Sequence, residues 1–141
     1  MNLLSRLAAR FHAAKPEHLR RGETGERAAQ RHLQSLGLKL LAANFRSDHG
    51  EIDLVFRDGD CLVFVEVKAR SRGNWTRPAA AVDAAKRRRL SKTALDYLRL
   101  LDDARVKIRF DIVEVQLADG VVSEVRHLPN CFTLSKPWRH G

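Results

Sequence analysis

Apolar residues recur at helical spacing in two stretches of the chain, residues 21–37 and about residues 80–101. The positions that share one face of the first stretch are Gly25, Ala29, Leu33 and Leu36. The corresponding positions of the second stretch are Val82, Leu90, Ala94, Tyr97 and Leu101. Such a stripe is typical of a helix that buries one side, so the pattern predicts two amphipathic helices. Gly37 provides a C-terminal stop for the first of them.

Runs rich in β-branched and aromatic residues predict strands between and after these helices. The first run is residues 38–45, and the last two are residues 106–117 and about 121–128. The stretch GEIDLVFRDGDCLVFVEVKAR, residues 50–70, has the pattern of two strands joined at Asp58-Gly59, a strong hairpin signal. The order of helix, three strands, helix and two strands predicts an α/β fold, in which a mixed β-sheet is flanked by helices.

The length of 141 residues is typical of one domain. We assign this domain to residues 17–130, after an amphipathic, basic segment at 1–16 and before a C-terminal tail at 131–141. The first segment has no acidic residue, so a transit peptide or a membrane-surface helix is an alternative to a loosely held helix ended by Pro16. No apolar run approaches the ~18 residues that a membrane span needs.

Charge narrows the range of partners. The formal net charge is +9 and the isoelectric point is near 10.4. This excess of positive charge favours a polyanionic partner, with nucleic acid first and an anionic membrane or ribosomal RNA as the other options. Cys61 and Cys131 are far apart and lack the spacing of a zinc site or redox pair, which favours a reduced, cytoplasmic setting.

Four charged residues stand among the apolar residues of the 50–70 stretch: Glu51, Asp53, Glu66 and Lys68. An unpaired carboxylate in a dry sheet is costly, so such residues sit on a wet face, pair with each other or hold a metal. The strand that carries Glu66 is apolar on both faces up to that residue, as a central strand would be. This favours a site over a solvated face of alternating charge, which remains the alternative.

Strand pairing decides whether these side chains meet. The pairs predicted by a two-residue loop at Asp58-Gly59 are Arg57 with Asp60, Asp53 with Phe64, and Glu51 with Glu66. Paired residues and residues two apart share a face, so all four charged side chains should project from one side of the hairpin. Asp53 and Glu66 can then close on a hard cation such as Mg²⁺, while Lys68 neutralises charge on a phosphate or activates a water.

Asp53, followed thirteen residues later by Glu66-Val67-Lys68, is similar to the PD-(D/E)xK signature of restriction-endonuclease-like nucleases, although Ile52 stands in place of the proline. The segments GETGERAA, GEIDLV, VFVEVKARS and RFDIVEV, with Lys86 in the second helix, resemble the YraN-like family of small bacterial proteins. That family is itself similar to archaeal Holliday-junction resolvases. The resemblance covers roughly residues 20–116 and implies a restriction-endonuclease-like fold.

The resemblance also implies roles for individual residues. Asp53 and Glu66 would be metal ligands, Lys68 the catalytic lysine, and Glu26 would reach the same site from the first helix. The further residues placed at the site are Glu51 and Arg70 as flanking groups and Lys86 as a supporting base or phosphate contact.

Basic residues cluster on the second helix and in the loop before it. The segment KRRRLSK, residues 86–92, carries five positive charges on just over two helical turns. Each neutralised phosphate lowers the log of affinity per log of salt by about 0.9, so binding through these groups would be strongly salt-dependent. The residues that we assign to nucleic-acid binding are Arg70, Arg72, Trp75, Arg77, Lys86, Arg87, Arg88 and Arg89. The alternatives are a charged face that keeps the helix soluble and a tryptophan that anchors its loop to the core.

Two further polar positions have an ordinary and a functional interpretation. Arg109 and Asp111 flank Phe110, and we expect them to form a buried ion pair rather than to orient a site residue. His49 stands in a loop just before Glu51, where a general base is the less favoured interpretation.

These observations predict an endonuclease that uses Mg²⁺ (or Mn²⁺) to hydrolyse phosphodiester bonds of DNA, including branched or junction DNA. The alternative is a non-catalytic nucleic-acid-binding module with the same fold. A ribosome-associated or RNA-processing role fits the charge but has no motif behind it. Resolvases act as dimers because a four-way junction has two symmetric cleavage points, so the resemblance also admits a homodimer.

Overall fold

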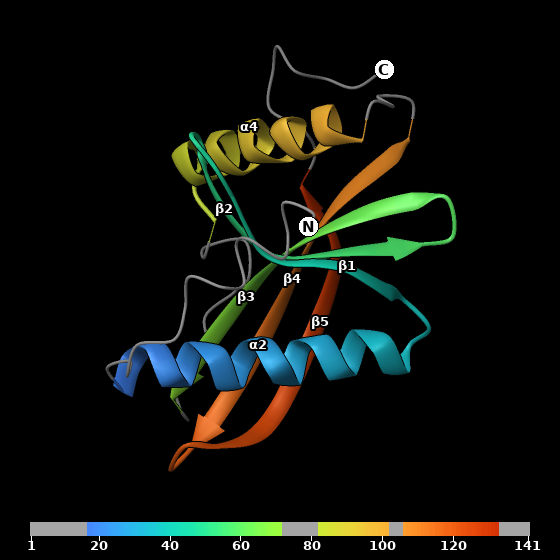
Figure 1. Ribbon diagram of the computed structural model, residues 1–141. Helices are drawn as coiled ribbons and strands as arrows, with labels where there is room; N and C mark the ends of the chain where they lie inside the picture. The colour runs from blue at the N-terminus through green and yellow to red at the C-terminus, as the bar shows by residue number, and fades with distance from the viewer. Residues whose placement is uncertain (1–16, 72–81, 102–105, 133–141) are drawn as a thin grey trace, which may run out of the picture.

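The computed structural model describes residues 17–71, 82–101 and 106–132, and this part of the chain forms a five-stranded sheet with one helix on each face (Figure 1). The elements in chain order are α2 (Glu17–Ser35), β1 (Lys39–Ser47), β2 (Gly50–Asp58), β3 (Cys61–Ser71), α4 (Ala84–Leu100), β4 (Lys107–Ala118) and β5 (Val121–Phe132). The predicted segment 1–16 and most of the predicted tail lie outside the described residues. Among the described helices, none is long and apolar enough to cross a membrane.

The sheet is mixed, as the sequence predicts. Its strand order is β1-β2-β3-β4-β5. The β1–β2, β2–β3 and β4–β5 pairs are antiparallel, whereas β3 and β4 are parallel. The parallel pair is the one whose connection contains α4, because parallel strands need a long crossover. β3 is therefore the central strand, with a neighbour along each edge.

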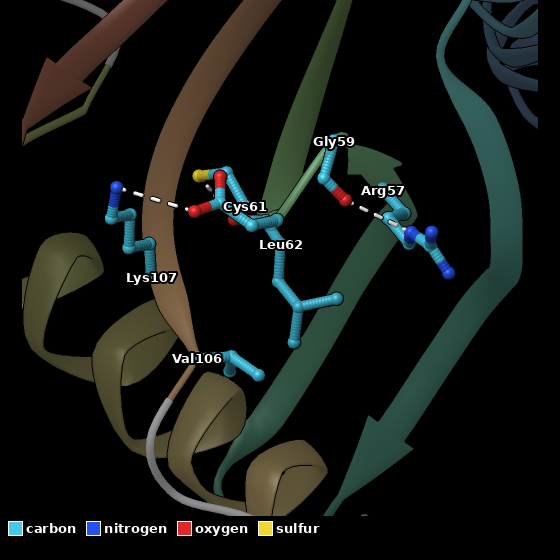
Figure 2. Close-up of a pocket in the computed structure, with 7 residues that line it drawn as sticks. Arg57, Gly59, Cys61, Leu62, Val106 and Lys107 are labelled. Carbon is cyan, nitrogen blue, oxygen red and sulfur yellow. Dashed lines mark hydrogen bonds and ion pairs between the residues drawn. The ribbon is translucent and has the colours of Figure 1, made fainter.

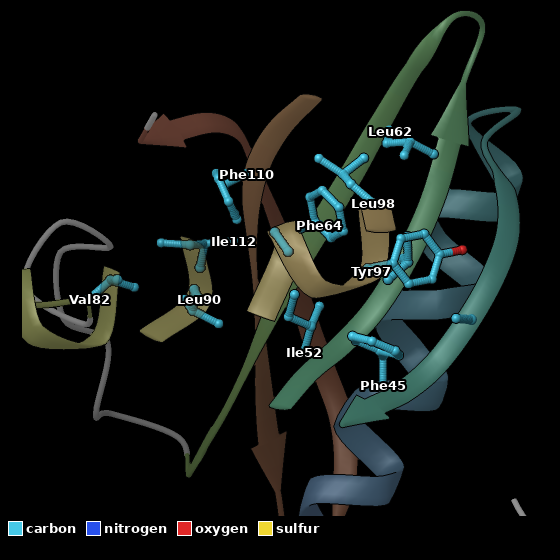
Figure 3. Close-up of a cluster of buried hydrophobic side chains, with 13 residues drawn as sticks. Phe45, Ile52, Leu62, Phe64, Val82, Leu90, Tyr97, Leu98, Phe110 and Ile112 are labelled. Atoms are coloured by element: carbon cyan, nitrogen blue, oxygen red, sulfur yellow. The ribbon is translucent and has the colours of Figure 1, made fainter. Parts of the chain in front are cut away.

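Alternation along β3 divides the core into two layers. Phe64 packs on the α4 side, whereas the next residue, Val65, packs on the α2 side. On the α4 side Tyr97 meets Phe45 and Phe64 edge-on, with ring centroids 5.1 and 5.8 Å apart (Figure 3). Edge-to-face pairs of this kind contribute about 0.5–1.5 kcal/mol beyond the area that they bury. The two layers explain why β3 is apolar on both faces.

The helix ends depart from the prediction in two ways. α4 begins at Ala84, because the side chain of Asp83 accepts a hydrogen bond from the backbone N of Lys86 at 2.8 Å and caps the helix there. Leu36 and Leu101, predicted to lie on apolar faces, are 55% and 43% exposed. Each comes directly after the last residue of its helix, so helical spacing no longer sets its direction.

Gly25 allows α2 to lie unusually close to β3. A Cβ at this position would stand 2.8 Å from the Cβ of Ala69, well inside the ~3.5–4.0 Å at which two carbon atoms pack. Because glycine has no side chain, this turn of α2 can lie directly against the central strand. Glu26, the next residue, is carried by that turn.

Asp111 in β4 is fully buried, and its carboxylate is satisfied by neighbours on three sides. Oδ1 accepts hydrogen bonds from the backbone N of Asn130 at 2.9 Å and from Nε of Arg109 at 3.1 Å. Oδ2 lies 2.8 Å from Nε2 of His127. Arg109 also reaches Asp58 with Nη1 at 2.8 Å, which ties β4 to the end of β2. The expected Arg109–Asp111 ion pair is confirmed.

Candidate active site

The β2–β3 hairpin turns one residue later than predicted. Asp58 pairs with Cys61, so the two loop residues are Gly59 and Asp60, and the predicted pairing of Arg57 with Asp60 is wrong. Gly59 has a φ of 59°, and the first loop position of a type II′ turn needs such a positive φ and favours glycine. The pairing moves by two residues in total, an even shift that keeps the paired residues 54–58 and 61–65 on the faces that the sequence predicted.

Asp53 lies where the regular alternation of β2 breaks. Ile52 and Val55 both pack on the α4 side, although they are three residues apart. The β1–β2 pairing passes from Ala43 with Leu54 to Phe45 with Ile52, and Asn44, between the two β1 residues, has a φ of 54°. Asp53 lies within this irregular stretch, and its side chain is directed toward β3.

The carboxylate of Asp53 bridges the point where β2 and β3 separate. The Cα pairing of these strands ends at Leu54 with Val65. Just beyond it, Oδ2 of Asp53 accepts a hydrogen bond from the backbone N of Val67 at 2.7 Å. Beyond the last paired residues, this side-chain hydrogen bond replaces the backbone hydrogen bonds between the two strands. It holds Asp53 beside Glu66.

Glu66 receives two lysine ammonium groups on one oxygen atom. Nζ of Lys86, from α4, lies 2.6 Å from Oε1, and Nζ of Lys68, two residues along β3, lies 3.4 Å from it. The side chain of Glu66 is only 11% exposed, and those of Lys68 and Lys86 are 23% and 27% exposed. Lys86 is thus paired with Glu66 in this structure, and its role as a supporting base or phosphate contact stays a prediction. Glu51 pairs with Arg46 on β1, at 3.3 Å. The β2–β3 Cα pairing ends at Leu54 with Val65, so the predicted pairing of Glu51 with Glu66 is wrong.

The site holds charges that its surroundings disfavour. Burial raises the pKa of Asp53 well above its ordinary value, and the charge of Glu66 adds to this shift, against the hydrogen bond from Val67. Burial also lowers the pKa of Lys68, helped by the nearby Lys86. For Lys86 burial acts to lower the pKa, but the contacts with Glu66 and Lys68 outweigh it and the pKa is raised. The cluster therefore combines an acid that resists ionisation with a lysine that resists protonation.

Glu26 approaches the same site from the opposite layer. Its charge contributes to the raised pKa of Asp53, as does that of Glu51. Asp53 in turn contributes to the raised pKa of Lys86 on α4. The gap between β2 and β3 thus brings Asp53 within electrostatic reach of both helices.

Two carboxylates of the site suit a divalent cation. Across the described part of the chain, no group of three or more His, Cys, Asp or Glu residues is arranged to hold a metal ion. Burial and, after it, the charge of Glu66 nevertheless raise the pKa of Asp53, and a cation between the two carboxylates would relieve their repulsion. Mg²⁺ commonly takes one or two protein carboxylates and completes its shell with water and substrate phosphate. The donor set therefore fits Mg²⁺ or Mn²⁺.

A family comparison agrees with the motifs that carry this site. The model of the uncharacterised protein family UPF0102 matches residues 25–115. The chain belongs to this family. A UPF0102 protein of Geobacter metallireducens is 40% identical over 114 residues, which are 81% of this chain and 93% of that protein. UPF0102 proteins of Symbiobacterium thermophilum and Solibacter usitatus are 43% and 46% identical, over 79% and 83% of this chain and 94% and 89% of their own lengths.

The basic residues of this UPF0102 protein are not all turned outward. Arg88 and Arg89 on α4 are exposed, whereas Nε of Arg87 donates a hydrogen bond to the carbonyl of Val82 at 3.1 Å. Nε of Arg70 is buried. The other residues assigned to nucleic-acid binding, Arg72, Trp75 and Arg77, lie outside the described residues.

Two further acidic residues of the described part of the chain were not predicted. Glu114 is fully buried and is the register partner of Lys68 in the β3–β4 pair. Alternation in RFDIVEV, which places it on the same side as Phe110 and Ile112, was the available signal. Asp96 lies with Oδ2 2.6 Å from Nδ1 of His49, and this contact holds the β1–β2 turn against α4.

A cavity of about 610 Å³ lies at the other end of the hairpin (Figure 2). It is lined by Arg57, Gly59, Asp60, Cys61, Leu62, Val106 and Lys107. Asp60 and Lys107 pair at 3.2 Å on its rim, and burial raises the pKa of Cys61, which disfavours the nucleophilic thiolate. The cavity shares no lining residue with the Asp53–Glu66 site.

Proposed function

We propose that this UPF0102 protein is a divalent-cation-dependent endonuclease that hydrolyses phosphodiester bonds of DNA, with branched DNA among its candidate substrates. The observation that carries the proposal is the apposition of Asp53 and Glu66 where β2 and β3 separate, with Lys68 and Lys86 beside them. A surface that only binds phosphate gains nothing from two carboxylates, because they repel the phosphate charge. When the carboxylates hold a divalent cation, the bound cation attracts the phosphate instead.

Each side chain has a role that follows from its surroundings. Asp53 and Glu66 would hold Mg²⁺ or Mn²⁺, which when bound polarises a phosphate and lowers the pKa of a coordinated water. Lys68 would stabilise charge on the phosphate or accept the proton of the attacking water, and its lowered pKa favours the second role. Lys86, which Glu66 keeps charged, would contact phosphate oxygens.

Fold and charge support the same proposal. A mixed sheet with one helix on each face and an acidic site at the parting of two central strands agrees with a restriction-endonuclease-like fold. The net charge of +9 and the exposed Arg88 and Arg89 favour a nucleic-acid partner. A homodimer would place two such sites on the symmetric strands of a junction.

A non-catalytic nucleic-acid-binding module is the second candidate, and one observation favours it. Both lysine ammonium groups already engage Glu66, at 2.6 and 3.4 Å, so the cluster partly balances its own charge. Such a module would bind DNA or RNA in a salt-sensitive way, without a divalent cation, and binding would survive Asp53→Ala.

The test compares cleavage of labelled linear, single-stranded, flap and four-way-junction DNA, with Mg²⁺, with Mn²⁺ and with a chelator. Wild type is set beside Glu66→Gln and a control, Asp60→Asn, which removes an exposed carboxylate at the far end of β3. We expect cation-dependent cutting by wild type and the control, and a loss of at least ~100-fold in Glu66→Gln. Binding without cutting of any substrate would instead support the non-catalytic module.

A further inference from the structure

Glu114 in β4 is buried without the partners that a carboxylate needs. Its side chain is 0% exposed, and within the described residues neither Oε1 nor Oε2 has a hydrogen-bond partner. Nη1 of Arg126 lies 3.8 Å from Oε2, too far for a hydrogen bond, and that side chain is 41% exposed. Arg126 stands at the same distance from Glu124. A carboxylate left in this condition costs folding free energy, so a purely structural role does not account for it.

The position of Glu114 links it to the candidate active site. Glu114 and Lys68 are register partners on the parallel strands β4 and β3. Partners on neighbouring strands stand about 4.8 Å apart and project from the same face. Lys68 therefore stands between two carboxylates, Glu66 two residues earlier on its own strand and Glu114 directly beside it. In the structure its ammonium group is turned to Glu66, at 3.4 Å.

The place of Lys68 at Glu66 conflicts with cation binding. Oε1 of Glu66 holds Lys86 at 2.6 Å as well as Lys68 at 3.4 Å. A divalent cation shared by Glu66 and Asp53 would repel both ammonium groups, since like charges interact strongly in a partly buried site. Lys68 has a flexible four-carbon stem, so its ammonium group can turn away from Glu66 without movement of the strand.

We propose that Glu114 is a positioning residue that receives the ammonium group of Lys68 when Glu66 takes up the divalent cation. Lys68 would leave Glu66 for Glu114 and stay beside the reacting phosphate. It would also donate to carboxylate oxygens that have no hydrogen-bond partner in the cation-free state. This inference rests on the proposed function, because it requires Glu66 to bind a cation.

The experiment measures Mn²⁺ affinity by calorimetry for wild type, Glu114→Gln, Lys68→Met and the double variant. Glu114→Gln is expected to bind Mn²⁺ about 10-fold more weakly, because Lys68 then remains at Glu66. In the Lys68→Met background the same substitution is expected to have no effect, since Glu114 acts through Lys68. Glu124→Gln, which removes an exposed charge on β5, serves as the matched control and should bind Mn²⁺ as wild type does. Melting curves should show Glu114→Gln at least as stable as wild type, because a neutral amide is cheaper to bury.

The outcomes separate the inference from the proposed function. Equal weakening in the Lys68→Met background would mean that Glu114 acts on the cation by its charge alone, and it would overturn the inference. Wild-type affinity in Glu114→Gln would also overturn it, while leaving the nuclease proposal intact. Failure of the wild-type protein to bind Mn²⁺ at all would remove the proposed function and the inference with it.

Discussion

Asp111 and Asp53 are two acidic residues of the same sheet whose surroundings differ in charge. Asp111 is fully buried and has Arg109, His127 and a backbone N–H as partners. Asp53 has one backbone N–H, and the other charges that shift its pKa upward are the carboxylates of Glu66, Glu26 and Glu51. Burial alone therefore does not distinguish a functional acid from a structural one. The balance of the neighbouring charges does, because the three carboxylates near Asp53 leave it with a charge that a bound cation would balance.

The largest effect is expected from Asp53→Asn, which removes the charge and retains an oxygen that can accept from Val67. Cleavage should fall by about 10²–10³-fold, since a cation ligand is lost, while the protein remains folded. Single-turnover cleavage in Mg²⁺, with circular dichroism as the check on folding, measures this. Cleavage within a few-fold of wild type would place the cation elsewhere.

Asp111→Ala is expected to act on stability instead. It leaves Arg109 and His127 without their shared partner, and removal of one member of a buried ion pair costs roughly 3 kcal/mol. Urea unfolding followed by fluorescence measures the loss. Asp60→Ala, which breaks the exposed pair with Lys107, is the control and should cause no measurable change. Equal stability of the two variants would contradict the structural role of Asp111.

Gly25→Ala tests whether the close contact of α2 with β3 holds Glu26 near Asp53. The added methyl group would meet Cβ of Ala69 at 2.8 Å, so α2 must shift, at a cost of about 1–3 kcal/mol, and Glu26 moves with it. Gly22→Ala in the same helix is the matched control, because nothing lies within 4 Å of its added Cβ. That variant should be more stable by about 0.5–1 kcal/mol. Thermal melts of both variants give the answer, and a shift of the same sign in each would refute the close contact.

The smallest effect is a pH dependence of stability in the absence of divalent cations. Because the folded protein raises the pKa of Asp53 above 3.8, it holds this proton more tightly than the unfolded chain does. Stability is therefore lost as pH rises from that ordinary value through the raised one. The advantage of Asp53→Asn over wild type should grow across this interval and then level off, as measured by urea unfolding at a series of pH values. A constant difference would contradict the raised pKa.

Much of the fold follows from the sequence, because helical and strand periodicities are local. Alternation also placed Glu66 and Lys68 on the face that they occupy. The turn at Gly59 was misplaced by one residue, since two adjacent positions offered similar loop chemistry. The direction of Asp53 toward β3 goes with a φ of 54° at Asn44, a non-glycine residue on the neighbouring strand, which no local pattern reveals. The position of Glu114 beside Lys68 could not be predicted, because it depends on the parallel register of β3 and β4. That register is set across the long connection that contains α4.

The most direct test of the central claim, that Asp53 and Glu66 form a cation site, compares the melting temperatures of wild type and Asp53→Asn with and without Mn²⁺. Without the cation we predict that Asp53→Asn is the more stable protein, because it lacks a repelled buried charge. With Mn²⁺ at 100 times its dissociation constant, wild type gains about 2.7 kcal/mol and the order should reverse. An unchanged order, with Mn²⁺ shifting both proteins equally or neither, would contradict the account.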